Sequence, residues 1–246
     1  NNEGLNMNNK LMTIVFAGLA AIAIPASSQA QETNLIFYGV QMEELEYRQG
    51  DQSENLLVWD GDAFIGTDEL KLRWLGKGEY DADGDVLETM ENRLVLQKPI
   101  SDFFDIKAGV RLDSPEGVDR WFGVFGVTGL APQWIEIDAD LFISETGDVS
   151  ARLDAGYELL ITNRLILTPS GEIDVALSDD REIGVASGLN SIELGLRLSY
   201  DVVDRTFSPY IGVVFERKFG RTADFARDEG EDPSALFAVI GAKLMF

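Results

Sequence analysis

The chain has 246 residues, with 43 acidic residues against 20 basic ones and a formal net charge of −23. This acidic surplus argues against nucleic acid as a partner, because phosphate binding requires an excess of Lys and Arg. The chain contains no His and no Cys, so it lacks the commonest general base, the commonest transition-metal ligand and any disulfide. Hydrophobic residues make up 45% of the chain, which suits a globular or barrel protein and is too low for a helical membrane bundle.

The first thirty positions read as a secretory signal peptide that starts at Met7. Lys10 supplies the positive region, residues 11–24 form the apolar region, and Ser28-Gln29-Ala30 carries small residues at the two cleavage-site positions. We therefore expect cleavage after Ala30. The alternative is an uncleaved anchor, but the apolar run is short for a membrane span. Residues 31–246 are then an exported domain.

Residues 31–246 show apolar and polar residues in alternation from start to end. In "DIKAGVRLD" (105–113), Ile106, Ala108, Val110 and Leu112 alternate with charged residues and glycine, which is the period of a strand with one apolar face. The same period recurs in about twelve segments, and no window shows a sustained helical period. The expected strands are 34–48, 54–66, 68–79, 86–97, 103–113, 119–131, 133–145, 149–161, 164–176, 189–202, 206–219 and 234–246.

Strands of this length and number predict an all-β fold, a single transmembrane antiparallel β-barrel of about 12 strands. The connections support the prediction. Alternate connections are short and turn-like, such as "KPISD" (98–102) and "TNR" (162–164), and two of the others are long and polar, at 178–189 and 220–234. A bacterial barrel has its tight turns in the periplasm and its longer loops outside.

The last expected strand, "ALFAVIGAKLMF", ends in Phe246. An aromatic residue there resembles the signal that the bacterial outer-membrane insertion machinery reads. Together with the signal peptide, this predicts a barrel in the outer membrane of a Gram-negative bacterium. Its apolar residues, Ile106 among them, then face outer-membrane lipids, and Lys107 and Arg111 face the lumen.

The residues expected to line the lumen are rich in charge. Two interpretations remain open: the acids and bases pair across the interior and brace the wall, or unpaired carboxylates form a cation-selective passage or binding surface. The expected inward charged residues are Glu44, Glu46, Arg48, Asp60, Asp62, Lys71, Arg73, Lys107, Arg111, Glu136, Asp138, Asp140, Arg152, Asp154, Glu158, Glu172, Asp174, Glu193 and Arg197.

Several stretches resemble the copper resistance protein B family of outer-membrane proteins. They include "QMEELEYRQGD" (41–51), "LLVWDGDAFIG" (56–66), "GLAPQWIE" (129–136) and "SPYIGVVFERKFG" (208–220). The pair formed by the last two is the most specific feature, and the resemblance covers nearly all of the chain after Ala30. It implies a role in copper homeostasis or resistance, with copper ions as the ligand.

The resemblance has one departure, since family members usually carry a Met- and His-rich segment before the barrel. Here Met42, Met90 and Met245 are the methionines after Ala30, too few and too scattered for a thioether site for Cu(I). The best metal-site candidate is Met42 with Glu44 and Glu46, expected on one face of the first strand, with Asp60 or Asp62 on the second strand within reach. The alternative is a plain stripe of lumen-lining residues. We expect any copper binding to be weak and led by carboxylates.

The sequence bears on three classes of function. An outer-membrane hydrolase is disfavoured, because such chemistry usually needs a His to activate a nucleophile or water. A non-enzymatic copper resistance barrel that binds or passes copper is the first choice, on the resemblance. A structural or general porin-like barrel without a specific metal role is the alternative.

Overall fold

The computed structural model describes residues 35–51, 54–114, 118–180, 183–230 and 232–246. The predicted signal peptide, residues 1–30, lies outside the described residues. The strands run in chain order as β1 (Phe37–Gly50), β2 (Asn55–Gly66), β3 (Lys71–Asp81), β4 (Val86–Pro99), β5 (Phe104–Asp113), β6 (Arg120–Ala131), β7 (Ile135–Ser144), β8 (Val149–Gly156), β9 (Leu159–Leu160), β10 (Leu165–Ala176), β11 (Gly188–Tyr200), β12 (Phe207–Lys218) and β13 (Ser234–Met245).

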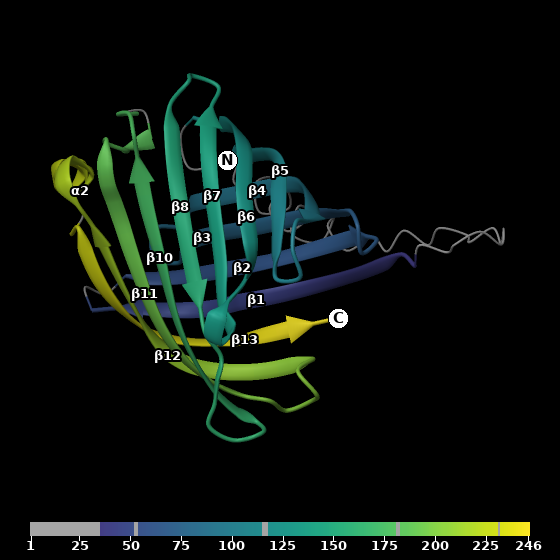
Figure 1. The fold of residues 1–246 in the computed structure, drawn as a ribbon. Coiled ribbons are helices and arrows are strands. Elements are labelled where there is room, and N and C mark those ends of the chain that lie inside the picture. Colours follow the sequence, from purple (N-terminus) through teal and green to yellow (C-terminus); the bar gives the residue numbers. More distant parts are fainter. Residues whose placement is uncertain (1–34, 52–53, 115–117, 181–182, 231) are drawn as a thin grey trace, which may run out of the picture. The chain divides into compact units, whose positions relative to one another are not determined.

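These strands form one closed antiparallel barrel (Figure 1). Apart from β8 and β9, which both pair with β10, each strand pairs with its neighbour in sequence, and β13 pairs with β1 to close the wall. The strands β8 and β9 follow one another along the same edge of β10. The thirteen strands of the described residues therefore fill twelve positions in the wall, which confirms the predicted barrel of about 12 strands.

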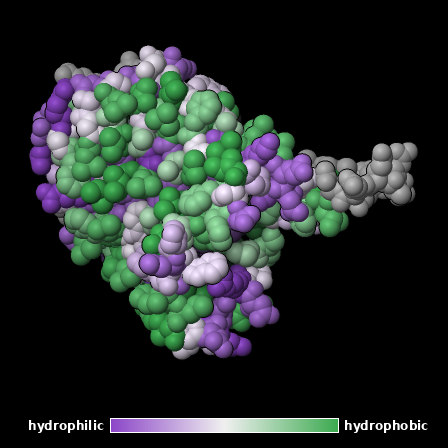
Figure 2. Space-filling model, viewed as in Figure 1, coloured by the Kyte–Doolittle hydropathy of each residue, from purple (hydrophilic) through white to green (hydrophobic). Residues whose placement is uncertain are grey.

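The two faces of the wall have opposite chemistry. On β5, the apolar Ile106 is 43% exposed, whereas its charged neighbour Lys107 is only 4% exposed. Exposed Leu, Ile, Val and Phe residues recur on the outside of β1–β13, and Figure 2 shows much of the outer wall as apolar, with hydrophilic residues gathered along the edge where the helix α2 (Gly220–Glu229) lies. An apolar belt of this extent requires lipid as its solvent. The period-two pattern therefore reports a membrane barrel, as predicted.

The strand predicted over 149–161 is interrupted. It ends at Gly156 and resumes as the short β9, and the break lies opposite Pro169 of β10. Proline has no backbone N–H to donate to a ladder, so Pro169 only accepts, from the N–H of Tyr157 at 3.1 Å. Glu158, predicted to face the lumen, lies in this break and pairs with Arg205 at the rim.

The long polar connections are not free loops, since the one expected at 220–234 contains a helix. Residues 220–229 form α2, which ends at Gly230 in the left-handed conformation that favours glycine. The helix is only ten residues long and mostly polar, so it leaves little periodic signal in the sequence. Its Ala223 and Ala226 are buried. Among the described residues, no helix has the length and apolar character to cross a membrane.

We predict that Ala108→Arg, on the outer face of β5, lowers the free energy of unfolding in lipid vesicles by about 2–4 kcal/mol, because it places a charge near the middle of the lipid belt. Urea titration of the refolded barrel measures this. The matched control is Ser101→Arg in the β4–β5 turn, which should leave stability nearly unchanged. Equal effects of the two substitutions would contradict the assignment of the outer face.

Candidate functional site

A row of acidic residues crosses the inner wall on consecutive strands. Asp138 of β7 lies opposite Asp154 of β8, and Asp154 lies opposite Glu172 of β10. Glu172 in turn lies opposite Glu193 of β11, which lies opposite Glu216 of β12. Directly opposed residues have Cβ atoms about 4.5–5.5 Å apart, and like charges in such positions repel. This acidic row therefore requires positive charge from elsewhere in the barrel.

A second row lies on the other side of the barrel. Here Glu44 of β1 is opposite Asp60 of β2, Asp60 is opposite Lys77 of β3, and Lys77 is opposite Glu91 of β4. Lys77 is the basic residue within this row. The lumen is thus lined by carboxylates on both sides, with basic residues inserted between them.

Arg48 of β1 supplies positive charge to carboxylates from three strands. Its guanidinium is fully buried and lies 2.6 Å from Glu216, 2.9 Å from Glu46, and 3.3–3.4 Å from Glu44 and Glu193. Planar Arg with several donors suits such a multidentate role. Arg48 therefore joins β1 to β11 and β12 across the lumen and neutralises one end of the acidic row.

Glu46 also has several hydrogen-bond partners within the wall. It accepts hydrogen bonds from Arg197 Nε at 2.5 Å and from Tyr210 Oη at 3.0 Å, in addition to that from Arg48. These donors come from β11, β12 and β1. All of its partners are basic or hydroxyl groups, so the charge of Glu46 is compensated within the wall.

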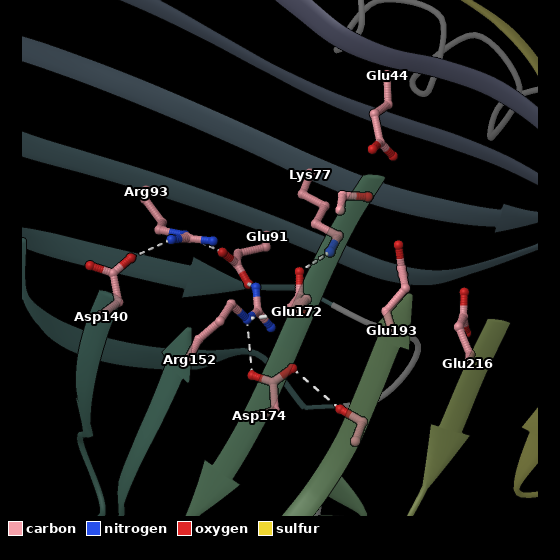
Figure 3. Close-up of polar contacts among 12 residues, drawn as sticks. Glu44, Lys77, Glu91, Arg93, Asp140, Arg152, Glu172, Asp174, Glu193 and Glu216 are labelled. Atoms are coloured by element: carbon pink, nitrogen blue, oxygen red, sulfur yellow. Dashed lines mark hydrogen bonds and ion pairs between the residues drawn. The ribbon is translucent and has the colours of Figure 1, made fainter. Parts of the chain in front are cut away.

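The other side of the lumen is braced by Glu91 and Asp140 (Figure 3). Glu91 pairs with Arg93, with Arg111 at 2.8 Å and with Arg152 at 3.2 Å. Asp140 pairs with Arg93 at 2.6 Å and with Lys107 at 2.9 Å, and Lys107 also pairs with Asp138. Arg152 reaches Asp174 at 2.9 Å and Glu172 at 3.3 Å. The interpretation that acids and bases pair across the interior is confirmed.

The structure brings together only some of the residues of the candidate metal cluster. A β-bulge in β1 between Met42 and Glu44 changes the face on which the chain alternates. Met42 is opposite Gly61, and a Cβ built on Gly61 would lie 2.9 Å from the Met42 sulfur. Because Gly61 falls on the outward-facing set of β2, Met42 lies on the outer face. The expectation that it shares a face with Glu44 and Glu46 was wrong.

The carboxylates of the candidate cluster differ in how far they are engaged. Asp62 accepts hydrogen bonds from Arg73 at 2.8 and 3.0 Å, so it resembles Glu46 in being compensated. Glu44 and Asp60 remain directly opposed on β1 and β2, although Arg197 lies 2.8 Å from Glu44. Of the predicted residues, these two come together at the lumen surface.

The donor chemistry sets what the lumen can bind. Within the described ranges, no group of three or more His, Cys, Asp or Glu residues is arranged to hold a metal ion. The donors that face the lumen are mainly carboxylate oxygens, which discriminate poorly among divalent cations. The arrangement can attract and exchange cations through its charge, and it offers little nitrogen or sulfur for tight copper coordination.

Several lumen residues were missed although the sequence carried a signal for them. Lys77 continues the inward-facing series of Lys71 and Arg73. Glu91 and Arg93 lie on the same inward face as the buried Val95. The same holds for Glu216, two residues after buried Val214. Following each alternation to the end of its strand would have found them. Their ion-pair partners depend on how the strands are aligned with one another, and the composition does not reveal that alignment.

The connection between β10 and β11 folds inward over one mouth of the barrel. Ile183 packs against the lumen-facing cluster of Val95, Phe122, Val124 and Phe142, and Asp180 pairs with Arg120 at 3.0 Å. The helix α2 adjoins this connection, where Thr222 Oγ1 accepts a hydrogen bond from the N–H of Ala186 at 3.1 Å. The lumen is thus narrowed at the end that carries the long connections.

Comparison with known proteins gives matches over the barrel. The family described as copper resistance protein B precursor matches residues 36–246. A copper resistance protein B homolog of Pseudomonas syringae pv. tomato is 37% identical over 190 residues, 77% of this chain and 64% of the relative. Copper resistance protein B of Escherichia coli is 36% identical over 211 residues, 86% of this chain and 70% of the relative. The chain thus spans about two thirds of the length of these relatives.

A solved structure of the NanC porin covers 85% of this chain and 99% of its own, with a TM-score of 0.50 and 12% identity. At this low identity the similarity shows only the fold, which is that of an outer-membrane barrel.

We predict that Arg48→Met lowers the free energy of unfolding by about 3–5 kcal/mol, because it leaves buried carboxylates without their counter-charge. Arg73→Met is the matched control and should cost less, since Arg73 is partly exposed and, within the described residues, forms its hydrogen bonds with the single acid Asp62. The loss from Arg48→Met should shrink as the pH falls, because protonation removes the carboxylate repulsion. Urea titration at several pH values measures both effects. A loss equal to that of the control, or one independent of pH, would contradict the role of Arg48.

Proposed function

Because this chain belongs to the copper resistance protein B family, we propose that it serves copper resistance in the outer membrane as a barrel whose acidic lumen receives copper ions. The observation that carries the proposal is the acidic row on β7, β8, β10, β11 and β12, together with the opposed Glu44 and Asp60. A lumen in which carboxylates outnumber basic groups raises the local concentration of cations. The role is non-enzymatic, since a chain without His and Cys lacks the usual means of activating a nucleophile.

Copper enters this proposal as a weakly held cargo. Cu(II) prefers imidazole nitrogen and Cu(I) prefers thiolate or thioether sulfur, whereas the lumen offers oxygen. Binding is therefore led by carboxylates and exchanges readily. The ligands we propose are the opposed Glu44 and Asp60, with Glu46 and Asp62 as flanking acids; Glu44, Glu46 and Asp62 each also pair with Arg. Met42 lies on the outer face, away from these ligands.

The alternative function is a structural or general porin-like barrel with no specific metal role. The dense pairing of lumen charges favours this reading, because carboxylates engaged by Arg48, Arg93 and Arg152 are not free to hold an ion. The family membership favours the copper role. The two are separated by copper tolerance in cells.

The lengths of the connections indicate which mouth of the barrel faces outside the cell. We propose that the mouth with α2 and the connection 177–187 faces outside, and that the turn at 98–102 faces the periplasm, because bacterial barrels have their longer loops outside.

We also propose that β13 carries the contact with the outer-membrane insertion machinery. Phe246 is exposed, and its backbone pairs with Val40 of β1 through hydrogen bonds of 2.9 and 3.0 Å, at the seam where the barrel closes. Phe246→Ala should slow assembly, because it removes the exposed aromatic group while keeping the backbone pairing. Pulse labelling followed by heat-modifiable migration measures the rate. Unchanged kinetics would reject the contact.

We predict that the double substitution Glu44→Gln and Asp60→Asn lowers copper binding and copper tolerance while the barrel still assembles, because it removes the opposed charges and keeps side-chain size. Glu44→Gln with Glu46→Gln tests the two glutamates of the cluster predicted on β1, and Met42→Leu is the matched control that should leave tolerance unchanged. Tolerance is measured by growth in copper after complementation of a deletion strain, and binding by titration of the refolded barrel. Full tolerance in the double variants would reject these ligands. Full tolerance in the deletion strain itself would reject the copper role and leave the structural barrel.

A further inference from the structure

One ion pair joins opposite sides of the barrel. Lys77 of β3 lies 2.7 Å from Glu172 of β10, and Figure 3 shows the two side chains reaching toward each other from the two walls. In the strand order, β4 to β8 separate β3 from β10 on one side, and β11, β12, β13, β1 and β2 separate them on the other. The pair therefore crosses the lumen along its full width.

The other bridges lie on one side or the other of this pair. Arg93 and Arg152 connect β4 with β7 and β8, and Arg48 connects β1 with β11 and β12. Lys77 and Glu172 lie between these two groups of bridges. They form the boundary that divides the lumen into two narrower parts, each filled by its own ion pairs.

The Lys77 ammonium occupies a position that would otherwise suit a free cation. Its bonded partner Glu172 is the middle member of the acidic row, and Glu193 and Asp60 also act on its charge. Asp154 lies directly opposite Glu172 on the neighbouring strand β8 and flanks it on the row. Lys carries a compact point charge on a flexible stem, so one side chain from β3 can reach across and sit among these carboxylates.

We propose that Lys77 is a tethered cation that closes the lumen and sets its ion permeability. The ammonium occupies the cation position at the centre of the acidic row, and the Lys77–Glu172 pair, with the bridges on either side of it, obstructs passage along the barrel axis. The proposal concerns any small cation. It therefore goes beyond the copper role and is tested without copper.

The experiment measures conduction of the refolded full chain in planar lipid bilayers with KCl. Lys77→Ala should raise the conductance several-fold over that of the unsubstituted barrel and shift the reversal potential in a KCl gradient toward that of K⁺, because the acids it neutralised now face the path. Lys77→Arg should keep the low conductance, since an arginine spans the same gap with the same charge.

The matched control is Lys107→Ala. Lys107 is also a buried lumen lysine, but it pairs with Asp138 and Asp140 on β7, two positions along the wall from its own strand β5. Its removal should leave conductance and ion selectivity close to those of the unsubstituted barrel. Heat-modifiable migration confirms that each variant is folded before it is measured.

Two outcomes would overturn the proposal. The first is a folded Lys77→Ala barrel with the conductance and selectivity of the unsubstituted one, which would make the pair a brace only. The second is an equal rise in Lys77→Ala and Lys107→Ala, which would reflect general loosening of the wall. Either outcome leaves the copper-tolerance test unaffected, so failure here is distinguishable from failure of the copper role.

Discussion

The structure depends on the neutralisation of a row of like charges. Asp138, Asp154, Glu172, Glu193 and Glu216 lie side by side on adjacent strands, and a wall with this row would repel itself in a lumen of low dielectric. Positive charge arrives mainly from other strands, through Lys107, Lys77 and Arg48. The apolar outer belt explains why the chain is a membrane barrel. The charged interior explains why its cross-section is held in one arrangement.

The same charges decide what the barrel can do. A chain with a net charge of −23 retains an acidic surplus after its ion pairs are formed, and part of that surplus lines the lumen. Such a surface attracts cations through its field and holds them weakly, because its ligands are oxygen atoms. Bracing and cation handling are thus two uses of one set of side chains, and the opposed Glu44 and Asp60 are the members proposed for the second use.

The sequence predicted the barrel well because period-two alternation is a local property. The strand number, the face of Lys107 and the short connections could all be read from neighbouring residues. The site was harder, because it depends on register. The bulge after Met42 moved this residue to the outer face, and no local pattern marks a bulge in a polar strand. Pro169 likewise broke its neighbour, β8, rather than its own strand. The helix α2 was not predicted from the sequence, because its stability comes from the burial of Ala223 and Ala226 and not from a long amphipathic repeat.

The bridge between Lys77 and Glu172 also has a consequence for how the barrel is made. The two residues are 95 positions apart in the sequence, and Arg48 and Glu216 are 168 positions apart. Until β13 pairs with β1, Arg48 on β1 is not held next to Glu193 and Glu216 on β11 and β12. Closure of the seam therefore also completes the compensation of these two acids. A half-built barrel is electrostatically strained, and this strain favours completion over arrest at an open sheet.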